Sequence, residues 1–279
     1  MLHASFPEHR RKRFARQLVL PELGPAGQAA LGRASALIVG AGGLGSPAIA
    51  YLAGAGLRRL TIVDPGRVEL ADLHRQILFG DADVGRAKAE AAAERARAVD
   101  PELDVVARVE AFGEADGRAL ARGHDVILDA SDNPATRYLV SDACVLEGRP
   151  LVFGAVSRLE GQVARLVADG APCYRCLYPE APPPDAIPSC AEAGVAGPAA
   201  GVIGAWMALE AIRQVAGLGG AAPEGLLHLD LANWLQQRVR IARRPDCAAC
   251  GTTPTIRELR LDPAACRAGE PYPGPFTEG

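Results

Sequence analysis

Three glycines in the pattern G-x-G-x-x-G mark the part of the chain that is best suited to bind a nucleotide. Gly40, Gly42 and Gly45 follow the apolar run 36–39, and an apolar helical stretch begins directly after them. A second apolar run further along the chain ends on Asp64. In a strand–turn–helix–strand unit, such glycines let the backbone approach a phosphate, and the acid suits a ribose hydroxyl. The pattern predicts nucleotide binding without naming the nucleotide; a purely structural glycine-rich turn is the alternative.

Four cysteines in two C-x-x-C pairs form a second group that could do chemistry. Cys173 and Cys176 make one pair, and Cys247 and Cys250 make the other after a long insert. Two such pairs can supply four thiolates to a tetrahedral zinc ion, and because sulfur then takes every position, the zinc would be structural. A dithiol redox centre and an iron–sulfur cluster are the alternatives, although a redox motif does not need a second pair.

Charged and amide side chains are expected beside a bound phosphate. Arg75 and Gln76 lie in an irregular stretch after Asp64, and ligands of open α/β sheets bind beyond the carboxyl ends of the strands. Lys88 is one of only two lysines among 30 basic residues. It falls in the first turn of a helix expected over 86–99, where the helix dipole disfavours a cation. A nearby phosphate would favour a cation there, so we hypothesise that Lys88 is a phosphate ligand.

Acidic and amide side chains also follow a strand that is expected over 125–128. They are Asp129, Asp132 and Asn133. Two acids at the edge that carries the glycine loop could hold magnesium through carboxylate and water ligands. Equally, these residues could simply cap the helix that begins at Pro134. The residues alone leave both interpretations open.

Composition limits the class of protein. Apolar residues make up 49% of 279, enough for a substantial core, and the net charge of −3 argues against a general nucleic-acid or membrane-surface binder. The chain starts polar and basic, and no window of about 20 apolar residues lacks Gly, Pro or a charge. We therefore expect a cytoplasmic protein that binds neither membranes nor nucleic acid. Four of seven cysteines lie in the two pairs, unlike a secreted disulfide framework.

The order of the expected elements is typical of an α/β fold. Short apolar strands alternate with helices up to about residue 147, which predicts a Rossmann-like, mostly parallel sheet. The strands expected at 151–156 and 161–167 follow one another directly, as do those at 226–231 and 234–241, so antiparallel strands should extend the sheet. We expect four parts: an N-terminal helical arm over 1–33, a nucleotide-binding part over 34–170, a zinc-binding part with a Pro-rich crossover loop over 171–250, and a tail over 251–279 with a mobile end.

Several short motifs occur in a fixed order over about residues 8–250. They are RFARQ at 13–17, GAGGLGSP at 40–47, DLHRQ at 72–76, DVGRAK at 83–88, ASDN at 130–133, EGQV at 160–163, CYRC at 173–176, SCAEAGV at 189–195 and the closing C-x-x-C. In this order they resemble the bacterial MoeB and ThiF family, which is related to the ubiquitin-activating enzymes. The agreement of independent motifs is far more specific than the glycine loop alone.

The resemblance implies an adenylyltransferase that uses ATP and magnesium. It would activate the C-terminal Gly-Gly of a small ubiquitin-like sulfur-carrier protein, giving an acyl-adenylate and pyrophosphate, for molybdopterin, thiamin, tRNA-thiolation or secondary-metabolite pathways. Residues 171–250 would bind the carrier, the enzyme would be a homodimer, and a separate sulfurtransferase would supply sulfur because few residues follow Cys250. The competing hypotheses are an NAD-dependent oxidoreductase with His74 or His124 as base, and a non-catalytic scaffold.

The resemblance also implies roles for matching positions. The residues implied for binding the nucleotide are Gly40, Gly42, Gly43, Gly45, Asp64, Asp72, Gln76 and Asn133. The residues implied for catalysis are Arg75 and Lys88 on the phosphates, Asp132 on magnesium, and Arg16, which would cross a homodimer interface into the neighbouring site. Without the resemblance, the basic helix expected over 8–18, which carries Arg16, would be a solvated surface helix.

Two positions leave questions open. The family commonly has Asn where this chain has Asp72. A negative charge there should repel ATP unless it helps to hold magnesium or pairs with Arg75. Cys190 follows the Pro-rich loop. In ThiF-like members the matching cysteine can become joined to the carrier during sulfur transfer, and a buried structural cysteine is the alternative.

Overall fold

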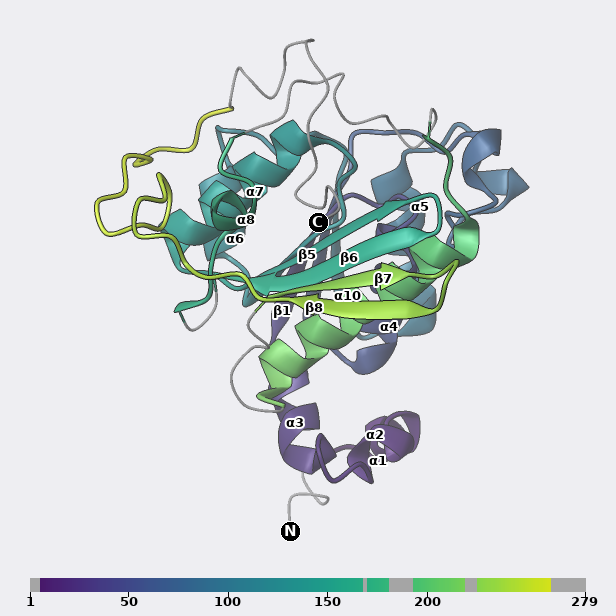
Figure 1. Ribbon diagram of the computed structural model, residues 1–279. Helices are drawn as coiled ribbons and strands as arrows, with labels where there is room; N and C mark the ends of the chain where they lie inside the picture. Colours follow the sequence, from purple (N-terminus) through teal and green to yellow (C-terminus); the bar gives the residue numbers. More distant parts are fainter. Residues whose placement is uncertain (1–5, 168–169, 181–192, 219–224, 262–279) are drawn as a thin grey trace.

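The computed structural model describes residues 6–167, 170–180, 193–218 and 225–261. Within these residues, one eight-stranded sheet separates two layers of helices (Figure 1). The strand order is β3-β2-β1-β4-β5-β6-β7-β8. Cys190 and the end of the C-terminal tail lie outside the described residues.

The first five strands of the sheet are parallel, as the alternation of strands and helices predicts. Their central strands are apolar and buried along nearly their whole length, which is typical of a parallel sheet covered on both faces. The strands are β1 (Ser35–Val39), β2 (Arg59–Val63), β3 (Asp104–Arg108), β4 (Val126–Asp129) and β5 (Leu151–Ser157).

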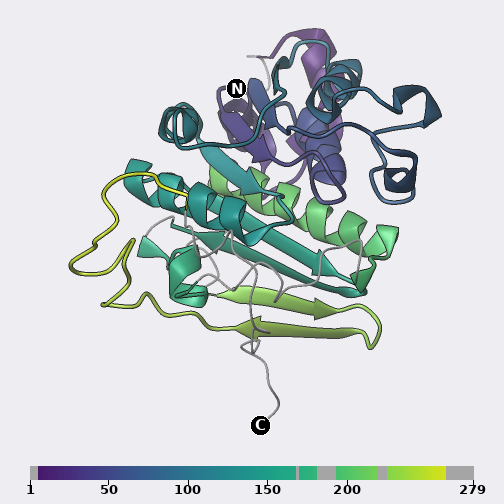
Figure 2. The ribbon, with the colours of Figure 1, turned by 90° about the horizontal axis from the view of Figure 1, so that it is seen from above.

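Antiparallel strands extend the sheet beyond β5, which confirms the second part of the fold prediction. They are β6 (Glu160–Leu166), β7 (Leu226–Asp230) and β8 (Leu235–Val239), and Figure 2 shows β7 and β8 at one border of the molecule. The β5–β6 and β7–β8 connections are short. Arg158 and Trp234 adopt left-handed backbone conformations there, with φ of 54° and 57°.

Helices cover both faces of the sheet. One layer contains α3 (Gly24–Leu31), α4 (Gly45–Ala55), α5 (Lys88–Val99) and α10 (Gly197–Ala216). The other contains α6 (Gly117–Arg122), α7 (Pro134–Glu147) and the short α8 (Tyr174–Leu177). Cys144 on α7 is fully buried. No helix in the described parts is long and apolar enough to cross a membrane.

The N-terminal arm packs onto its own chain. The sequence predicts one helix over 8–18, but the chain forms α1 (Glu8–Arg13) and α2 (Ala15–Leu18), with a break at Phe14. Phe14 is buried under Gly56, where φ is +88° and a Cβ would lie 2.5 Å from the Phe14 ring. Arg10 donates two hydrogen bonds to Asp100, at 2.9 and 2.7 Å. The arm is therefore fixed at two points.

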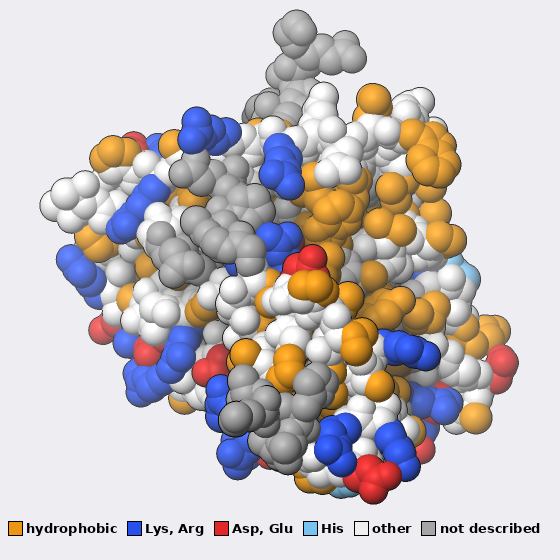
Figure 3. All heavy atoms as spheres, turned by 90° about the horizontal axis from the view of Figure 1, so that it is seen from below, with side chains coloured by type: hydrophobic (Ala, Val, Ile, Leu, Met, Phe, Trp, Pro, Cys, Tyr) orange, Lys and Arg blue, Asp and Glu red, His pale blue; other side chains and the backbone are white. Residues whose placement is uncertain are grey.

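Large apolar side chains remain exposed around the arm and on two neighbouring helices. The exposed fractions are 70% for Val19, 61% for Tyr51 on α4 and 49% for Leu209 on α10. Figure 3 shows apolar side chains gathered over part of the face seen from below the view of Figure 1, the side on which α3 and α10 lie. Exposed apolar surface of this kind is typical of a protein–protein interface.

Candidate nucleotide site and metal centre

A cavity of about 500 Å³ opens where the parallel strands end. Its volume lies in the range of small-molecule sites. The sequence-predicted residues that line it are Gly40, Gly42, Gly43, Asp64, Arg75, Gln76, Lys88, Asp132 and Asn133. Gly45 and Asp72 do not line it: Gly45 begins α4, and Asp72 lies behind the cations.

The glycine loop is pinned between the start of α4 and the chain that follows β4. Gly40 has a φ of +101°, and a Cβ there would lie 2.6 Å from the Ala130 carbonyl oxygen. A Cβ on Gly45 would clash with the Gly40 carbonyl. Only glycine fits these two positions, so they shape the loop. Gly42 and Gly43 are the members whose missing side chains leave cavity space near Gln76 and Arg75.

Asp64 ties the glycine loop to the turn after β2. One carboxylate oxygen accepts a hydrogen bond from the Ala41 N–H at 2.7 Å, and the other accepts one from the Gly66 N–H, also at 2.7 Å. Each oxygen keeps a lone pair for a further donor. The position and the remaining acceptor capacity suit a ribose hydroxyl.

The Asp72 carboxylate contacts three polar side chains of the cavity wall: Arg75, Gln76 and Lys88. One of its oxygens accepts hydrogen bonds from Arg75 at 2.9 Å and Gln76 at 2.7 Å. The other lies 3.0 Å from the Lys88 ammonium and accepts the Glu69 N–H at 3.1 Å. Of the outcomes that the sequence allowed for this carboxylate, the structure shows the pairing with Arg75, and it adds an ion pair with Lys88.

Lys88 lines the cavity from the first residue of its helix, which starts later than expected. The sequence predicts a helix from residue 86, but Ala87 pairs with Arg67 as an isolated β-bridge and the Lys88 N–H donates to Gly66 O at 2.9 Å. Helix α5 therefore begins at Lys88. The aliphatic stem of Lys88 passes over Gly66, whose Cβ position lies 3.5 Å from the lysine Cδ.

The polar cluster after β4 divides between the cavity and the core. Asn133 caps α7, since its side chain accepts the Thr136 N–H at 2.9 Å. Asp132 is exposed to the cavity. Asp129 is buried, bonds to Ser131 and does not line the cavity, and burial raises the pKa of its carboxyl. The idea that Asp129 and Asp132 together hold magnesium is therefore corrected, because of these two acids only Asp132 lines the cavity.

Further polar residues line the cavity and were missed as individual site residues, among them the acid Glu160. Arg137 follows the α7 cap by one turn, Gln162 lies on β6 within the EGQV motif, and His228 lies on β7. The EGQV motif could have identified Gln162 as a site residue. The cap of α7 at Asn133 could have identified Arg137, which lies one turn later. Nothing in the sequence marked His228.

Several predicted residues are not brought to the cavity. Arg16 is exposed on α2 and does not line the cavity of its own chain. His74 does not line it either. His124 is buried, with Nδ1 2.7 Å from Leu120 O and Nε2 2.8 Å from the Thr61 hydroxyl. The oxidoreductase hypothesis, which needs one of these histidines as a base, is not supported.

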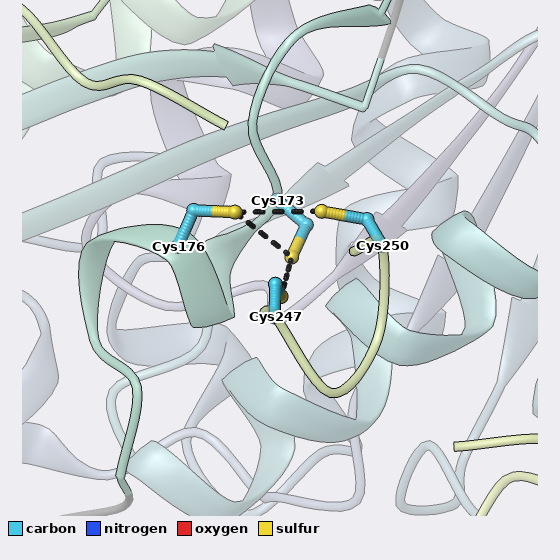
Figure 4. Close-up of side chains that lie close together, drawn as sticks. All are labelled: Cys173, Cys176, Cys247 and Cys250. Carbon is cyan, nitrogen blue, oxygen red and sulfur yellow. Dashed lines mark hydrogen bonds between the residues drawn. The ribbon is translucent and has the colours of Figure 1, made fainter. Parts of the chain in front are cut away.

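The four paired cysteines converge at one point between α8 and the 245–251 turn (Figure 4). Their sulfur atoms lie within 4.8 Å of one another, with Cys173–Cys176, Cys173–Cys247 and Cys176–Cys250 separations of 3.9, 3.5 and 3.4 Å. Four sulfurs bound tetrahedrally to zinc lie about 3.8 Å apart. The donor set and spacing fit a zinc ion of structural type.

Electrostatics in the cysteine cluster favour a bound cation. A hydrogen bond from Cys173 lowers the pKa of Cys176 to about 4, whereas the same bond and burial raise the pKa of Cys173. Burial raises the pKa of Cys250 to about 11. Without a metal, one thiolate therefore suppresses the ionisation of its neighbours. A divalent cation removes that conflict, since it binds thiolates.

The cysteine cluster is joined to the cavity by aromatic contacts and a hydrogen bond. Tyr174, next to Cys173, packs its ring 5.1 Å from Phe153 and 4.9 Å from Tyr178. The Tyr178 hydroxyl donates to the Gln162 side chain at 3.1 Å. Residues beside the metal centre thus help to position a side chain of the cavity wall.

The glycine loop, the charged cavity at a parallel sheet edge and the four-cysteine cluster together define a nucleotide-binding α/β protein with a cysteine cluster that could bind zinc. The chain belongs to the ThiF family, whose model matches residues 14–249. It is 46% identical over 252 residues to the sulfur carrier protein adenylyltransferase of Thermus thermophilus, covering 88% of this chain and 93% of that protein.

Longer relatives share the same part of the chain. The adenylyltransferase and sulfurtransferase MOCS3 of Sus scrofa is 48% identical over 249 residues, which is 89% of this chain and 55% of that protein. The chain therefore spans about half the length of the MOCS3 relatives it matches. Among solved structures, E. coli MccB has a TM-score of 0.77 at 19% identity, covering 88% of this chain and 73% of that one. The ATP complex of E. coli MccB has a TM-score of 0.70 at 19% identity, with 89% and 83% covered. This likeness concerns the fold.

Proposed function

We propose that this protein adenylylates the C-terminal carboxylate of a small ubiquitin-like sulfur-carrier protein that ends in Gly-Gly, using ATP. The observation that carries the proposal is the arrangement of Arg75, Lys88 and Asp64 with the glycine loop around one cavity. Membership of the ThiF family, with a named sulfur carrier protein adenylyltransferase 46% identical over nearly its whole length, supports the same reaction.

In the proposed reaction, a carboxylate oxygen of the carrier bonds to the α-phosphorus of ATP. The bond between that phosphorus and the oxygen bridging to the β-phosphate breaks, and pyrophosphate leaves. Both reactants are anions, so positioned cations should lower the barrier most. Arg75 and Lys88 would neutralise the triphosphate, and Asp64 would bind the ribose.

We propose two metals with separate tasks. Magnesium would be held by Asp132, which lines the cavity, and would supply further positive charge to the phosphates. Zinc would be held by the four cysteines as a structural ion. A separate sulfurtransferase would act after adenylylation. Cys190 is the residue proposed for covalent attachment to the carrier, on the basis of its motif alone.

We also propose that the enzyme is a homodimer in which Arg16 completes the partner's site. Arg16 is exposed and lies outside the cavity of its own chain. The apolar side chains exposed near it and on α4 and α10, including Val19, Tyr51 and Leu209, supply surface that a second copy could bury. We propose that the chain divides into four parts: the arm over 1–33, the nucleotide-binding part over 34–170, the zinc- and carrier-binding part over 171–250, and the tail over 251–279.

The test is exchange of labelled pyrophosphate into ATP. Each small protein that ends in Gly-Gly and is encoded in the same genome is added in turn with magnesium. We expect exchange with at least one of them and none after its last two glycines are removed. Absence of exchange with every such carrier would refute the proposed function.

A further inference from the structure

Three permanently charged cations line the described cavity, and they belong to two separate regions. Arg75 and Lys88 lie beside the turns after β1 and β2, with side-chain carbons 3.7 and 3.5 Å from the Cβ positions of Gly43 and Gly66. Arg137 lies further along the sheet. It donates to the Ser131 carbonyl after β4 at 3.2 Å.

The sheet order fixes the separation of these cations. The guanidinium of Arg137 lies 5.4 Å from the ring centre of Phe153 on β5. Strand β4 lies between β1 and β5, and neighbouring strands are about 4.8 Å apart. The two regions of positive charge are therefore centred on different strands of one cavity, which suits two different anionic groups.

Arg137 also differs from the other two cations in its partners. Arg75 and Lys88 both contact the Asp72 carboxylate. In the described part of the chain, no carboxylate oxygen lies within 4.0 Å of the Arg137 guanidinium, and its buried Nε makes no hydrogen bond. Its side-chain partner is a neutral group, the Tyr174 hydroxyl, and Asp129 acts on it only through space, because the hydrogen bonds of Asp129 go to Ser131. A guanidinium held in this way is costly to desolvate without an anion.

We propose that Arg137 binds the terminal carboxylate of the carrier tail, while Arg75 and Lys88 hold the triphosphate. This inference rests on the proposed function. A guanidinium matches a carboxylate through two parallel N–H donors, and Nε supplies one such donor. Gln162 lines the same cavity and can donate to a carbonyl of the tail. Its side-chain oxygen is fixed by the Tyr178 hydroxyl at 3.1 Å.

The division of cations has a chemical purpose. If all positive charge lay on the triphosphate, the attacking carboxylate would meet only repulsion on its approach. A dedicated cation lets the second anion bind before reaction and sets its position. Arg137 is then a substrate-binding residue, so its loss should weaken carrier binding much more than ATP binding.

The test uses Arg137→Met, which keeps the aliphatic bulk and removes the charge, with the carrier that gives the fastest pyrophosphate exchange. We expect the KM for this carrier to rise by about tenfold or more, while the dissociation constant of magnesium–ATP changes less than about threefold. In the absence of ATP, the wild-type protein should bind the free carrier more tightly than the same carrier with an amidated C-terminus. Arg137→Met should lose this preference.

Two further variants make the result decisive. Arg137→Lys should recover part of the carboxylate preference. Arg118→Met, which removes a guanidinium paired with Glu147 at the far end of α7, should keep all of it. A full carboxylate preference in folded Arg137→Met or, if that variant does not fold, no preference in Arg137→Lys would overturn the proposal. Absence of exchange by the wild-type protein with every carrier would instead defeat the proposed function, and this inference with it.

Discussion

Lys88 and Asp72 form an ion pair with 3.0 Å between the ammonium nitrogen and a carboxylate oxygen. The second oxygen of the same carboxylate accepts a hydrogen bond from Arg75 at 2.9 Å. The protein thus holds an anion of its own beside the two cations proposed for the triphosphate. Because Asp72 is buried, its carboxylate positions these cations and also offsets part of their charge before a nucleotide arrives.

Asp72→Asn should therefore have two effects in opposite directions. Metal-free ATP should bind about three- to tenfold more tightly, because Arg75 and Lys88 lose a competing negative charge. The free energy of unfolding should fall by about 1–3 kcal/mol, because one buried charge partner is lost. ATP titration in EDTA and urea denaturation measure the two effects. Asp81→Asn, an exposed acid nearby, should change neither; weaker ATP binding in Asp72→Asn would contradict the competition.

The two lysines offer a matched pair of variants. Lys88→Met should lower the rate of pyrophosphate exchange by about 100-fold or more, since it removes a positioned cation from the phosphates. Lys12→Met removes an exposed lysine that pairs with Glu8 on α1, and exchange should be unchanged. The measurement is the initial rate of pyrophosphate exchange of each variant at saturating ATP and carrier. Equal rates for the two variants would remove Lys88 from the reaction.

The cysteine cluster should contain about one zinc ion per chain. Cys247→Ser should lose most of this zinc and should be destabilised by several kcal/mol, because metal binding energy contributes to folding. Cys144→Ala is the control, because Cys144 is buried on α7 away from the cluster. Elemental analysis and thermal melting measure both properties. Iron in place of zinc, with visible absorbance, would favour the iron–sulfur alternative.

His124 should make stability depend on pH. Burial lowers the pKa of its imidazole below the ordinary 6.5, so the folded state prefers the neutral ring and the unfolded state takes up the proton first. The stabilisation is thus fully present above pH 6.5 and is lost as the pH falls toward the folded pKa. His124→Gln should lose less unfolding free energy than wild type between about pH 7 and about pH 5. Urea denaturation of the wild type and His124→Gln across this range measures the difference. If stability depends equally on pH in the two proteins, His124 is not the source of the effect.

A complementation experiment tests whether Arg16 acts across a dimer. Arg16→Met and Lys88→Met should each be inactive alone. In a mixed dimer, one site has both native residues if Arg16 comes from the partner chain, so equal mixing should restore about a quarter of the wild-type exchange rate. If Arg16 acts within its own chain, mixing restores nothing. Unfolding and refolding the two variants together allows the subunits to exchange.

Much of the fold could be predicted because local signals agreed with the packing. Helix α7 begins at Pro134 and ends before Gly148, which has a φ of +60°, as the N-terminal Pro and C-terminal Gly preferences suggest. The arm was harder. Its charge pattern gives no sign that Phe14 is buried beneath Gly56, and this long-range contact accompanies the break between α1 and α2.

The cavity was only partly predictable for a related reason. The residues that follow the ends of parallel strands could be placed at one edge by topology, which accounts for Asp64 and Asp132. The direction of a side chain on a helix or in a loop depends on tertiary packing instead. The sequence therefore did not reveal that Asp72 turns behind the cations or that Arg137 turns into the cavity.

The docking of the arm onto its own chain bears on how two copies would meet. Arg10 is fastened to Asp100, and Phe14 is inserted beneath Gly56, only a few residues before Arg16. The segment that would reach across is thus already shaped in the isolated subunit, and assembly would not have to order it. The two subunits would then associate as rigid bodies. Their association rate would depend on diffusional encounter and orientation, and not on a folding step.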